Sequence, residues 1–266
     1  MTPVTHVRED PRLKAVEWRD LTHLTGWQKA YEVSLSAPWL GMSFVFFHTG
    51  WIAAGLVTAF FFFLAALRQA HGAQHYFIGI GRTAQDWLLA VLSVLMVSSL
   101  HALQATHMHH HRHALEPSDF EAATARLRWW QALVAGPWFI VVLHWNGYRI
   151  ARPSKRRWIR GEGIAVLCWV TSVCLWGPAA ARWFVGAMIA GECLTGFFAV
   201  WTVHHDCDPD LQLARTQRGI WKNLVSYEMF YHVEHHLFPA VPTPRLPELA
   251  ARLDRAMPHL SREQVF

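Results

Sequence analysis

The sequence predicts an all-α integral membrane protein that forms a single domain over residues 1–266. Its 266 residues are 53% hydrophobic and only 16% charged, a balance that soluble domains of this length rarely have. The apolar residues are grouped in long runs, and basic residues are concentrated beside those runs. These observations favour two pairs of transmembrane helices, with weaker apolar segments lying along the membrane interface.

The first apolar run covers residues 38–67 and has no charged side chain in 30 positions. One membrane span needs roughly 20 residues, so this run is too long for one upright helix and short for two. Extended to residues 33–71, it accommodates a tight helical hairpin that turns near residues 48–51. A single tilted span is the alternative.

The second clear run covers residues 163–203 and is interrupted by "GPAAAR" at residues 177–182. This pattern predicts two spans joined by a short turn. Two weaker runs, residues 87–103 and 132–148, are at or below the lower limit for a span. We interpret both as helices that lie along the interface.

Charge placement predicts the orientation of the chain. Five basic residues precede the first run, and the segment "RIARPSKRRWIR" at residues 149–160 precedes the last pair of spans. Short basic segments beside spans stay in the cytoplasm. We therefore expect a cytoplasmic N-terminal segment (residues 1–32), a cytoplasmic C-terminal tail (residues 240–266) and no cleavable signal, since residues 1–30 lack an apolar core.

Histidine is the most informative residue type, because eight of the 18 histidines form three clusters: "HGAQH", "HMHHH" and "HVEHH". On a helix, histidines at i and i+4 lie on one face, and the H-x-x-H-H form adds a third imidazole beside them. The histidine content predicts only about 0.08 of one H-x-x-H-H motif, so composition does not explain two copies. The clustered residues are His71, His75, His107, His110, His111, His232, His235 and His236.

Each cluster lies at the expected cytoplasmic end of an apolar run, so all three can meet on one side. If residues 87–103 crossed the bilayer, His71 and His107 would lie on opposite faces; we therefore interpret this segment as interfacial or re-entrant. Eight imidazoles exceed the about four to six ligands of one metal ion, so the clusters predict two metals. The alternative, interfacial histidines bonded to carbonyls or lipid headgroups, suits any single histidine better than it suits the repeated motif.

The order H-x-x-x-H, H-x-x-H-H, H-x-x-H-H, ending in "HVEHHLFP", resembles the membrane fatty acid desaturase superfamily over residues 38–247. The resemblance implies four transmembrane helices in two hairpins, a cytoplasmic histidine-rich cap and a di-iron centre (two Fe²⁺) that uses O₂. It implies that the eight clustered histidines are the iron ligands. Similar proteins commonly add a ninth histidine from the end of the last span, where we favour His204 over His205.

Two further expectations concern residues near the clusters. Many similar proteins carry Asn just before the third box, whereas this chain has "EMFYHVEHH", so Glu228 or Asn223 would have to substitute. Acidic side chains can orient ligand imidazoles through N–H bonds. Among the acidic residues near the clusters, Glu234 is the best candidate for such a role. We expect the others to lie in solvated loops: Asp119, Glu121, Asp206, Asp208 and Asp210.

The resemblance and the apolar surroundings together predict an oxidoreductase that desaturates a lipid acyl chain. The nearest alternative is a hydroxylase or ketolase of the same superfamily that acts on a carotenoid, alkane or other lipid. A non-catalytic metal-binding or metal-transporting membrane protein is a remote alternative. A transporter would place polar ligands within broken helices at mid-membrane, whereas the spans here contain Glu192 as the main ionisable exception.

The expected partners are the membrane, a lipid substrate and an electron donor. The chain has no fused "HPGG" haem-binding segment and no C-x-x-C pair, so electrons would come from a separate ferredoxin, rubredoxin or cytochrome. Residues 149–160 could attract an acidic donor, although binding of anionic headgroups is the favoured role. No nucleotide fingerprint is present, and we expect no nucleic-acid partner.

Overall fold

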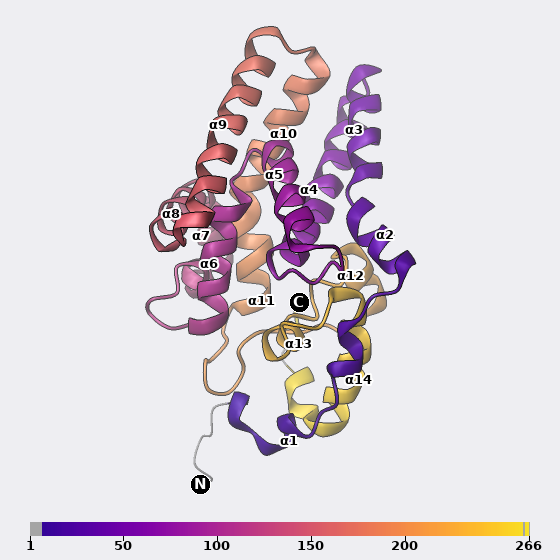
Figure 1. The fold of residues 1–266 in the computed structure, drawn as a ribbon, viewed down its shortest axis with the longest axis vertical. Coiled ribbons are helices and arrows are strands. Elements are labelled where there is room, and N and C mark those ends of the chain that lie inside the picture. Colours follow the sequence, from indigo (N-terminus) through magenta and orange to yellow (C-terminus); the bar gives the residue numbers. More distant parts are fainter. Residues whose placement is uncertain (1–6, 263, 266) are drawn as a thin grey trace.

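The computed structural model describes residues 7–262 together with residues 264–265. Residues 1–6, 263 and 266, which belong to the two predicted terminal segments, lie outside this described part. The described residues form helices and contain isolated β-bridges but no strand. Long helices extend toward one end of the molecule, and the short helices α1, α12, α13 and α14 gather at the other (Figure 1).

The first apolar run is divided into two helices. α2 (Gly26–Ser34) leads into α3 (Ala37–His48), and α4 (Ile52–Gln74) follows after a three-residue turn. Gly50 has a φ of +80° in this turn, a conformation that glycine adopts without strain. α3 and α4 run side by side (Figure 1), so residues 38–67 do not form one continuous helix. Of the two, α4 is long and apolar enough to cross a membrane, so a single span in this run remains an alternative to the hairpin.

Among the described residues, three helical segments are long and apolar enough to cross a membrane: α4, α9 (Pro153–Trp176) and the continuous stretch Ala179–His204. The last comprises α10 (Ala179–Thr195), the π-helix η4 (Gly196–Trp201) and α11 (Thr202–His204). The fourth predicted span corresponds to α3, which has only 12 residues and is short for a span. The structure therefore supports a membrane protein with three spans, or four if the bent pair described next counts as one.

The weaker run at residues 87–103 is broken. α5 (Arg82–Met96) and α6 (Leu100–His113) meet at an angle of 113°. Val97 ends α5 in the left-handed conformation, and the Ser99 hydroxyl accepts a hydrogen bond from the Ala102 amide to start α6. The sharp bend turns the chain, so α6 does not continue the direction of α5.

The other weaker run forms α7 (Trp129–Val134) and α8 (Gly136–Ile150). α8 packs tightly on its neighbours through glycines: a Cβ on Gly147 would meet the Ala102 carbonyl of α6, and one on Gly136 would meet the Cys193 carbonyl of α10. Its outer surface is rich in exposed tryptophan, including Trp138 and Trp145. Exposed tryptophan is typical of the membrane interface, which agrees with the predicted interfacial helices.

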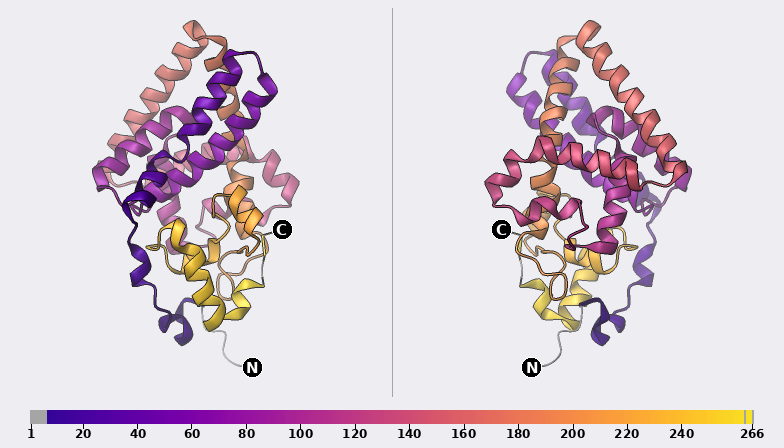
Figure 2. Two further views of the ribbon diagram at one scale, coloured as in Figure 1. Left: turned by 90° about the vertical axis from the view of Figure 1, so that its right-hand side faces the viewer. Right: turned by 90° about the vertical axis from the view of Figure 1, so that its left-hand side faces the viewer.

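Two large apolar cores lie among the described residues. In the orientation of Figure 1, we call the one among the long helices the upper core and the one among the short helices at the opposite end the lower core. The upper core packs α3, α4, α5 and α10 around Phe62, Phe63, Phe184 and Met188. α9, by contrast, exposes large apolar side chains such as Leu167 and Trp176, as a lipid-facing helix does. Figure 2 shows α9 and α10 projecting together with the α3–α4 pair.

The lower core joins the two ends of the chain. α1 (Pro11–Lys14) and the short helix α13 (His232–Leu237) both pack on α14 (Leu246–Ala256), and all three contribute to one apolar cluster. Arg252 of α14 donates to the Asp20 carboxylate at 2.6 and 2.7 Å. The segment predicted as a C-terminal tail is therefore a packed part of the fold beside α13.

Candidate metal centre

Four elements bring histidines to the boundary between the two cores. α4 ends with His71 and His75, α6 carries the second cluster, α11 ends at His204, and α13 carries the third cluster. The sharp bend between α5 and α6 is what allows α6 to reach the end of α4. Nine histidines gather there in two groups, and within each group the candidate ligand atoms lie within 4.8 Å of one another.

The first group contains five histidines and the second contains four. The first group is His71, His75, His107, His111 and His235. The second group is His110, His204, His232 and His236. All nine residues predicted from the sequence are thus brought together; their role as ligands stays a prediction.

The second group has the spacing of a coordination sphere. His204 Nε2 lies 3.1 Å from His110 Nε2 and 3.0 Å from His232 Nε2, while His236 Nε2 lies 3.2 Å from His232 Nε2 and 3.3 Å from His110 Nε2. With metal–nitrogen bonds of about 2.1 Å, ligands at a right angle are about 3.0 Å apart and opposite ligands about 4.2 Å. The four nitrogens therefore fit one metal ion.

The first group has the same spacing. His107 Nε2 lies 2.9 Å from His75 Nε2 and 3.2 Å from His111 Nε2, and His111 Nε2 lies 2.9 Å from His235 Nε2. The His71 ring stands edge-on to the His235 ring with their centroids 4.3 Å apart. The groups adjoin, because the rings of His111 and His236 stack at 4.4 Å. Two neighbouring metal sites fit this arrangement.

Partners at Nδ1 direct several Nε2 atoms inward. Glu121 accepts from His107 Nδ1 at 2.9 Å, Asp119 accepts from His110 Nδ1 at 2.6 Å, and the Leu213 carbonyl accepts from His204 Nδ1 at 2.9 Å. With the proton on Nδ1, each Nε2 presents a lone pair toward the same point as its neighbours. Facing lone pairs repel one another unless a cation lies between them, so the donor set fits a metal ion.

Burial of unpartnered nitrogens points the same way. Both ring nitrogens of His71 are buried without a hydrogen-bond partner among the described residues. Such atoms are costly unless something binds them. Burial, followed by the neighbouring imidazoles, lowers the pKa of His232, His235 and His236 well below the ordinary histidine value. These rings are therefore neutral, the form that binds metals.

The structure places some of the acidic residues beside the histidines and others away from them, whereas the sequence analysis expected most of them in solvated loops. That expectation is wrong for Asp119, which is buried, and for Glu121, whose side chain is 14% exposed. Burial raises the pKa of Asp119, but hydrogen bonds, with His110 foremost, outweigh it and lower that pKa to about 2. Asp119 also accepts from the Leu115 and Ala122 amides, so its own position is fixed.

The other acidic candidates contact no histidine of either group within the described part of the chain. Asp206 is exposed and pairs with Arg215, while Asp208 accepts from the backbone of its own turn. Asp210 lies in that same turn. Glu234, the candidate with the better claim, accepts instead from Thr216 and Arg218, and so anchors α13 to the lower core.

The neighbouring histidines His204 and His205 have different surroundings. His204 is buried in the second group, whereas His205 stacks on Trp201 at 4.1 Å and its Nδ1 donates to the Trp201 carbonyl. The π-helix η4 lies between α10 and His204 and changes the rotation of the helix. Thr124 donates to the Gly196 carbonyl at 2.8 Å and so satisfies a group at the start of η4.

Neither residue suggested in place of the missing Asn contacts the histidine groups within the described residues. The Asn223 side chain donates to the Gln217 carbonyl at 2.9 Å. Tyr227 and Glu228 both have positive φ angles, 52° and 66°. Burial raises the pKa of Glu228, which lies beside Arg68 and Glu32. The segment from Asn223 to Glu228 thus directs the chain into α13 but does not form hydrogen bonds with the imidazoles of that helix.

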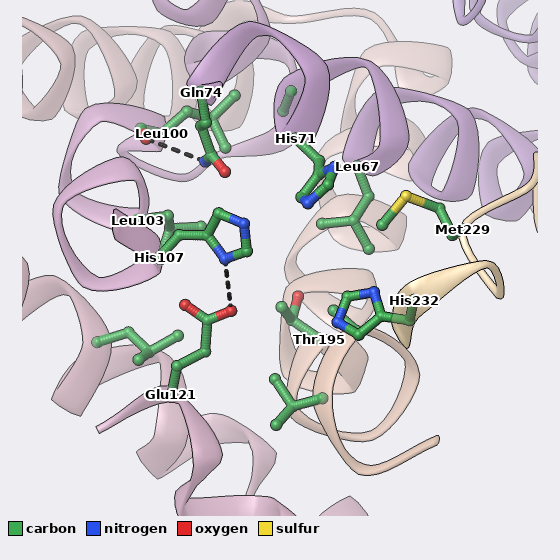
Figure 3. A pocket seen from close by; sticks show the side chains of 14 residues that line it. Leu67, His71, Gln74, Leu100, Leu103, His107, Glu121, Thr195, Met229 and His232 are labelled. Carbon is green, nitrogen blue, oxygen red and sulfur yellow. Dashed lines mark hydrogen bonds and ion pairs between the residues drawn. The ribbon is translucent and has the colours of Figure 1, made fainter. Parts of the chain in front are cut away.

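A narrow cavity of about 50 Å³ reaches the histidines from the upper core. His71 and His107 of the first group and His232 of the second line it, together with Gln74, Glu121 and Thr195 (Figure 3). The rest of the lining is apolar and consists of Leu67, Ala70, Leu100, Leu103, Leu143, Ala199, Val200 and Met229. The sequence analysis did not identify Gln74 or Thr195 as residues of the site. For Gln74, its position next to His75 could have indicated this; for Thr195 there was no such indication.

Helices of membrane-spanning length and two adjoining histidine groups define a membrane protein with a candidate binuclear metal centre. Within that class, the model of the family described as fatty acid desaturase matches residues 49–264, most of the chain. The chain belongs to this family. No match was found among curated proteins. Family membership and the histidine groups together indicate a function of the di-iron oxidase type.

Proposed function

We propose that the protein is an O₂-dependent di-iron oxidoreductase that desaturates a lipid acyl chain, with electrons supplied by a separate redox protein. The observation that carries this proposal is the cavity. It is narrow and apolar along most of its wall, and it ends between His71, His107 and His232, which come from both groups. An alkyl chain that enters it would have its carbons beside both metal positions.

The proposed iron ligands are the nine histidines of the two groups. Imidazole suits iron as well as zinc, copper and nickel, so the donor set is compatible with the family's usual metal. Iron bound there would supply the oxidising power that an unactivated C–H bond requires. The proposed ligands are His71, His75, His107, His110, His111, His204, His232, His235 and His236.

The side chains around the cavity would position the substrate, exclude water and hold the Nδ1 protons of the histidines in place. Leu103, Leu143 and Val200 would hold the acyl chain and exclude water from the cavity. Asp119 and Glu121 keep the Nδ1 protons of His110 and His107 in place, so both rings would stay oriented toward bound metals. Which carbon reacts would be set by how deeply the chain enters the cavity.

Orientation is a second part of the proposal. We expect the histidine groups and both termini to face the cytoplasm, because basic residues concentrate at the start of α9, on the histidine side of the molecule. A single cysteine at Arg156 of a cysteine-free variant should react with an impermeant thiol reagent from the cytoplasmic side. A cysteine at Ala179, the first residue of α10 after the turn from α9, should react from the opposite side, and the reverse result would refute this orientation.

Lipid analysis tests the reaction. Cells that express the protein and receive a deuterated fatty acid under ¹⁸O₂ should accumulate a lipid with one added double bond and no ¹⁸O. The His107→Ala variant should lack this product, and His205→Ala, which changes a histidine outside both groups, should retain it. A product that contains one ¹⁸O atom would instead identify a hydroxylase, and an unchanged lipid profile would refute both reactions.

A further inference from the structure

Glu192 is a buried ionisable residue within a helix long enough to span a membrane. It lies in α10, is 5% exposed, and neither of its carboxyl oxygens has a hydrogen-bond partner within the described part of the chain. A carboxylate is too costly in such surroundings, so the group holds a proton. Intramembrane ionisable residues of this kind frequently belong to proton relays.

Thr195 links this carboxyl to the candidate active cavity. It lies three residues after Glu192, and positions i and i+3 of a helix face the same side. Its hydroxyl is also buried without a partner, and its side chain lines the cavity beside His71 and His232 (Figure 3). Two adjacent buried oxygens without partners form a site that an ordered water molecule would satisfy.

Ser98 continues the polar path away from the cavity. Its side chain, in the turn between α5 and α6, interacts with the Glu192 carboxyl but does not have the geometry of a hydrogen bond to it. It donates to His144 Nε2 at 3.2 Å, and the amide of Ser99 donates to the same nitrogen at 2.9 Å. His144 Nδ1 donates to the Ile140 carbonyl, which fixes its tautomer.

From Ser99 the path reaches the surface through contacts of 2.5 to 3.2 Å. The Ser99 hydroxyl donates to Glu162 at 2.6 Å, and the other oxygen of Glu162 accepts from His101 Nδ1 at 2.5 Å. His101 Nε2 lies 3.2 Å from Asp86 Oδ1, and Asp86 accepts from Lys155 Nζ at 2.6 Å. His101 and Lys155 line a cleft whose exposed rim includes Arg152, so this end meets water.

We propose that these residues form a proton path from the cleft at Lys155 to the cavity at Thr195, with Glu192 as the proton store beside the cavity. The inference rests on the proposed function, because that reaction consumes protons. Desaturation converts –CH₂–CH₂–, O₂, two electrons and two protons into –CH=CH– and two water molecules. Hydroxylation of a C–H bond also consumes two protons and two electrons, and yields an alcohol and one water.

The path explains why polar groups interrupt an otherwise apolar part of the molecule. A cavity that holds an alkyl chain must exclude bulk water, yet both protons must still arrive during each turnover. Glu192 and Thr195 touch no candidate metal ligand through a hydrogen bond in the described residues. Their role is therefore separate from holding the metals.

Infrared spectroscopy tests the path without turnover. The full-length protein in lipid nanodiscs should show a protonated carboxyl band that the Glu192→Gln variant lacks. After transfer to D₂O, this band should shift at once in the unmodified protein and about tenfold more slowly in Glu162→Gln, which breaks the path at its middle. Glu248→Gln, on the surface of α14, is the control and should exchange like the unmodified protein.

An equal exchange rate in Glu162→Gln, or a Glu192→Gln variant that loses no carboxyl band, would overturn the proposal. Turnover gives a second readout. In Thr195→Val, which removes the hydroxyl at nearly constant volume, O₂ consumption should yield less oxidised lipid and more hydrogen peroxide, with KM little changed. Thr195→Ser should restore the yield, and equal yields in both variants would refute the role of the hydroxyl.

The two proposals fail separately. If the unmodified protein oxidises no lipid while carboxyl exchange still depends on Glu162, the proposed function is wrong and the proton path stands. If the unmodified protein oxidises lipid while every variant exchanges and couples normally, the path is wrong and the function stands.

Discussion

The two histidine groups differ in how firmly their imidazoles are held. In the second group, His110 and His204 donate from Nδ1 to the buried acceptors Asp119 and the Leu213 carbonyl. In the first group, Glu121 holds His107 from a partly exposed position. Buried ring nitrogens of His71, His111 and His235 lack a partner among the described residues, whereas in the second group His236 Nδ1 is in this position. The second group is therefore arranged before a metal binds, whereas the first depends more on the metal for its order.

Removing one imidazole from either group should give the largest effect. His107→Ala and His232→Ala should each abolish activity and lower the metal content from two ions per chain, while His205→Ala should retain both. Metal analysis of iron-loaded protein checks this. Zinc in overexpressed material would not count against it, because zinc competes well for imidazole sites. Two bound metals in His232→Ala would contradict the assignment of the second group.

Removing the Nδ1 partners should give a smaller effect that distinguishes the groups. Loss of such a partner typically lowers metal affinity by about 10- to 100-fold. Asp119→Asn should fall at the upper end, since Asp119 is buried and no water replaces it. Glu121→Gln should fall at the lower end, because that side chain is partly exposed. Titration of each variant with Fe²⁺ measures the difference, and equal losses would remove the contrast between the groups.

Acidification should then weaken both folding and metal binding. The folded pKa values of His232, His235 and His236 are depressed, so the unfolded chain binds more protons than the folded one as the pH falls. Their contribution to stability is full above the unfolded value of about 6.5 and is lost progressively below it. Thermal unfolding of the metal-free protein from about pH 8 to about pH 5, a range that brackets the unfolded pKa, should show this decline. A midpoint independent of pH would contradict it.

The order of metal release should show the smallest difference. His75 and His111 of the first group are partly exposed, whereas all four histidines of the second group are buried. A chelator should therefore remove the metal of the first group faster. Release of iron followed by Mössbauer or absorption spectroscopy would show two phases, and a single phase would mean that the groups lose metal as a unit.

The sequence predicted the histidines well because their information is local. Spacings of three and four residues place imidazoles on one helix face whatever the remaining fold does. The turn at residues 49–51 and the break after Trp176 likewise followed from apolar run lengths. The gathering of all nine histidines matches the prediction that the three clusters share one site.

The features that the sequence did not predict depend on contacts between distant segments. Asp119 and Glu121 look like residues of a solvated loop until that loop folds against α6. The partnerless hydroxyl of Thr195 matters only because the cavity lies beside it. The 113° bend between α5 and α6 occurs where Val97 adopts a left-handed conformation. β-Branched residues rarely adopt this conformation, so the sequence gives no reason to expect a bend there.

The π-helix η4 gives the last span a tolerance to changes in chain length. A π-helical turn holds one residue more than an α-helical turn, so η4 stores one extra residue between Thr195 and His204. Deleting one residue from this segment would restore a regular helix and keep the direction of His204. Straightening it without a deletion would turn His204 by about 100° and present Val203 in its place. Insertions and deletions among related sequences should therefore collect in this turn, where the helix can absorb them without moving a histidine.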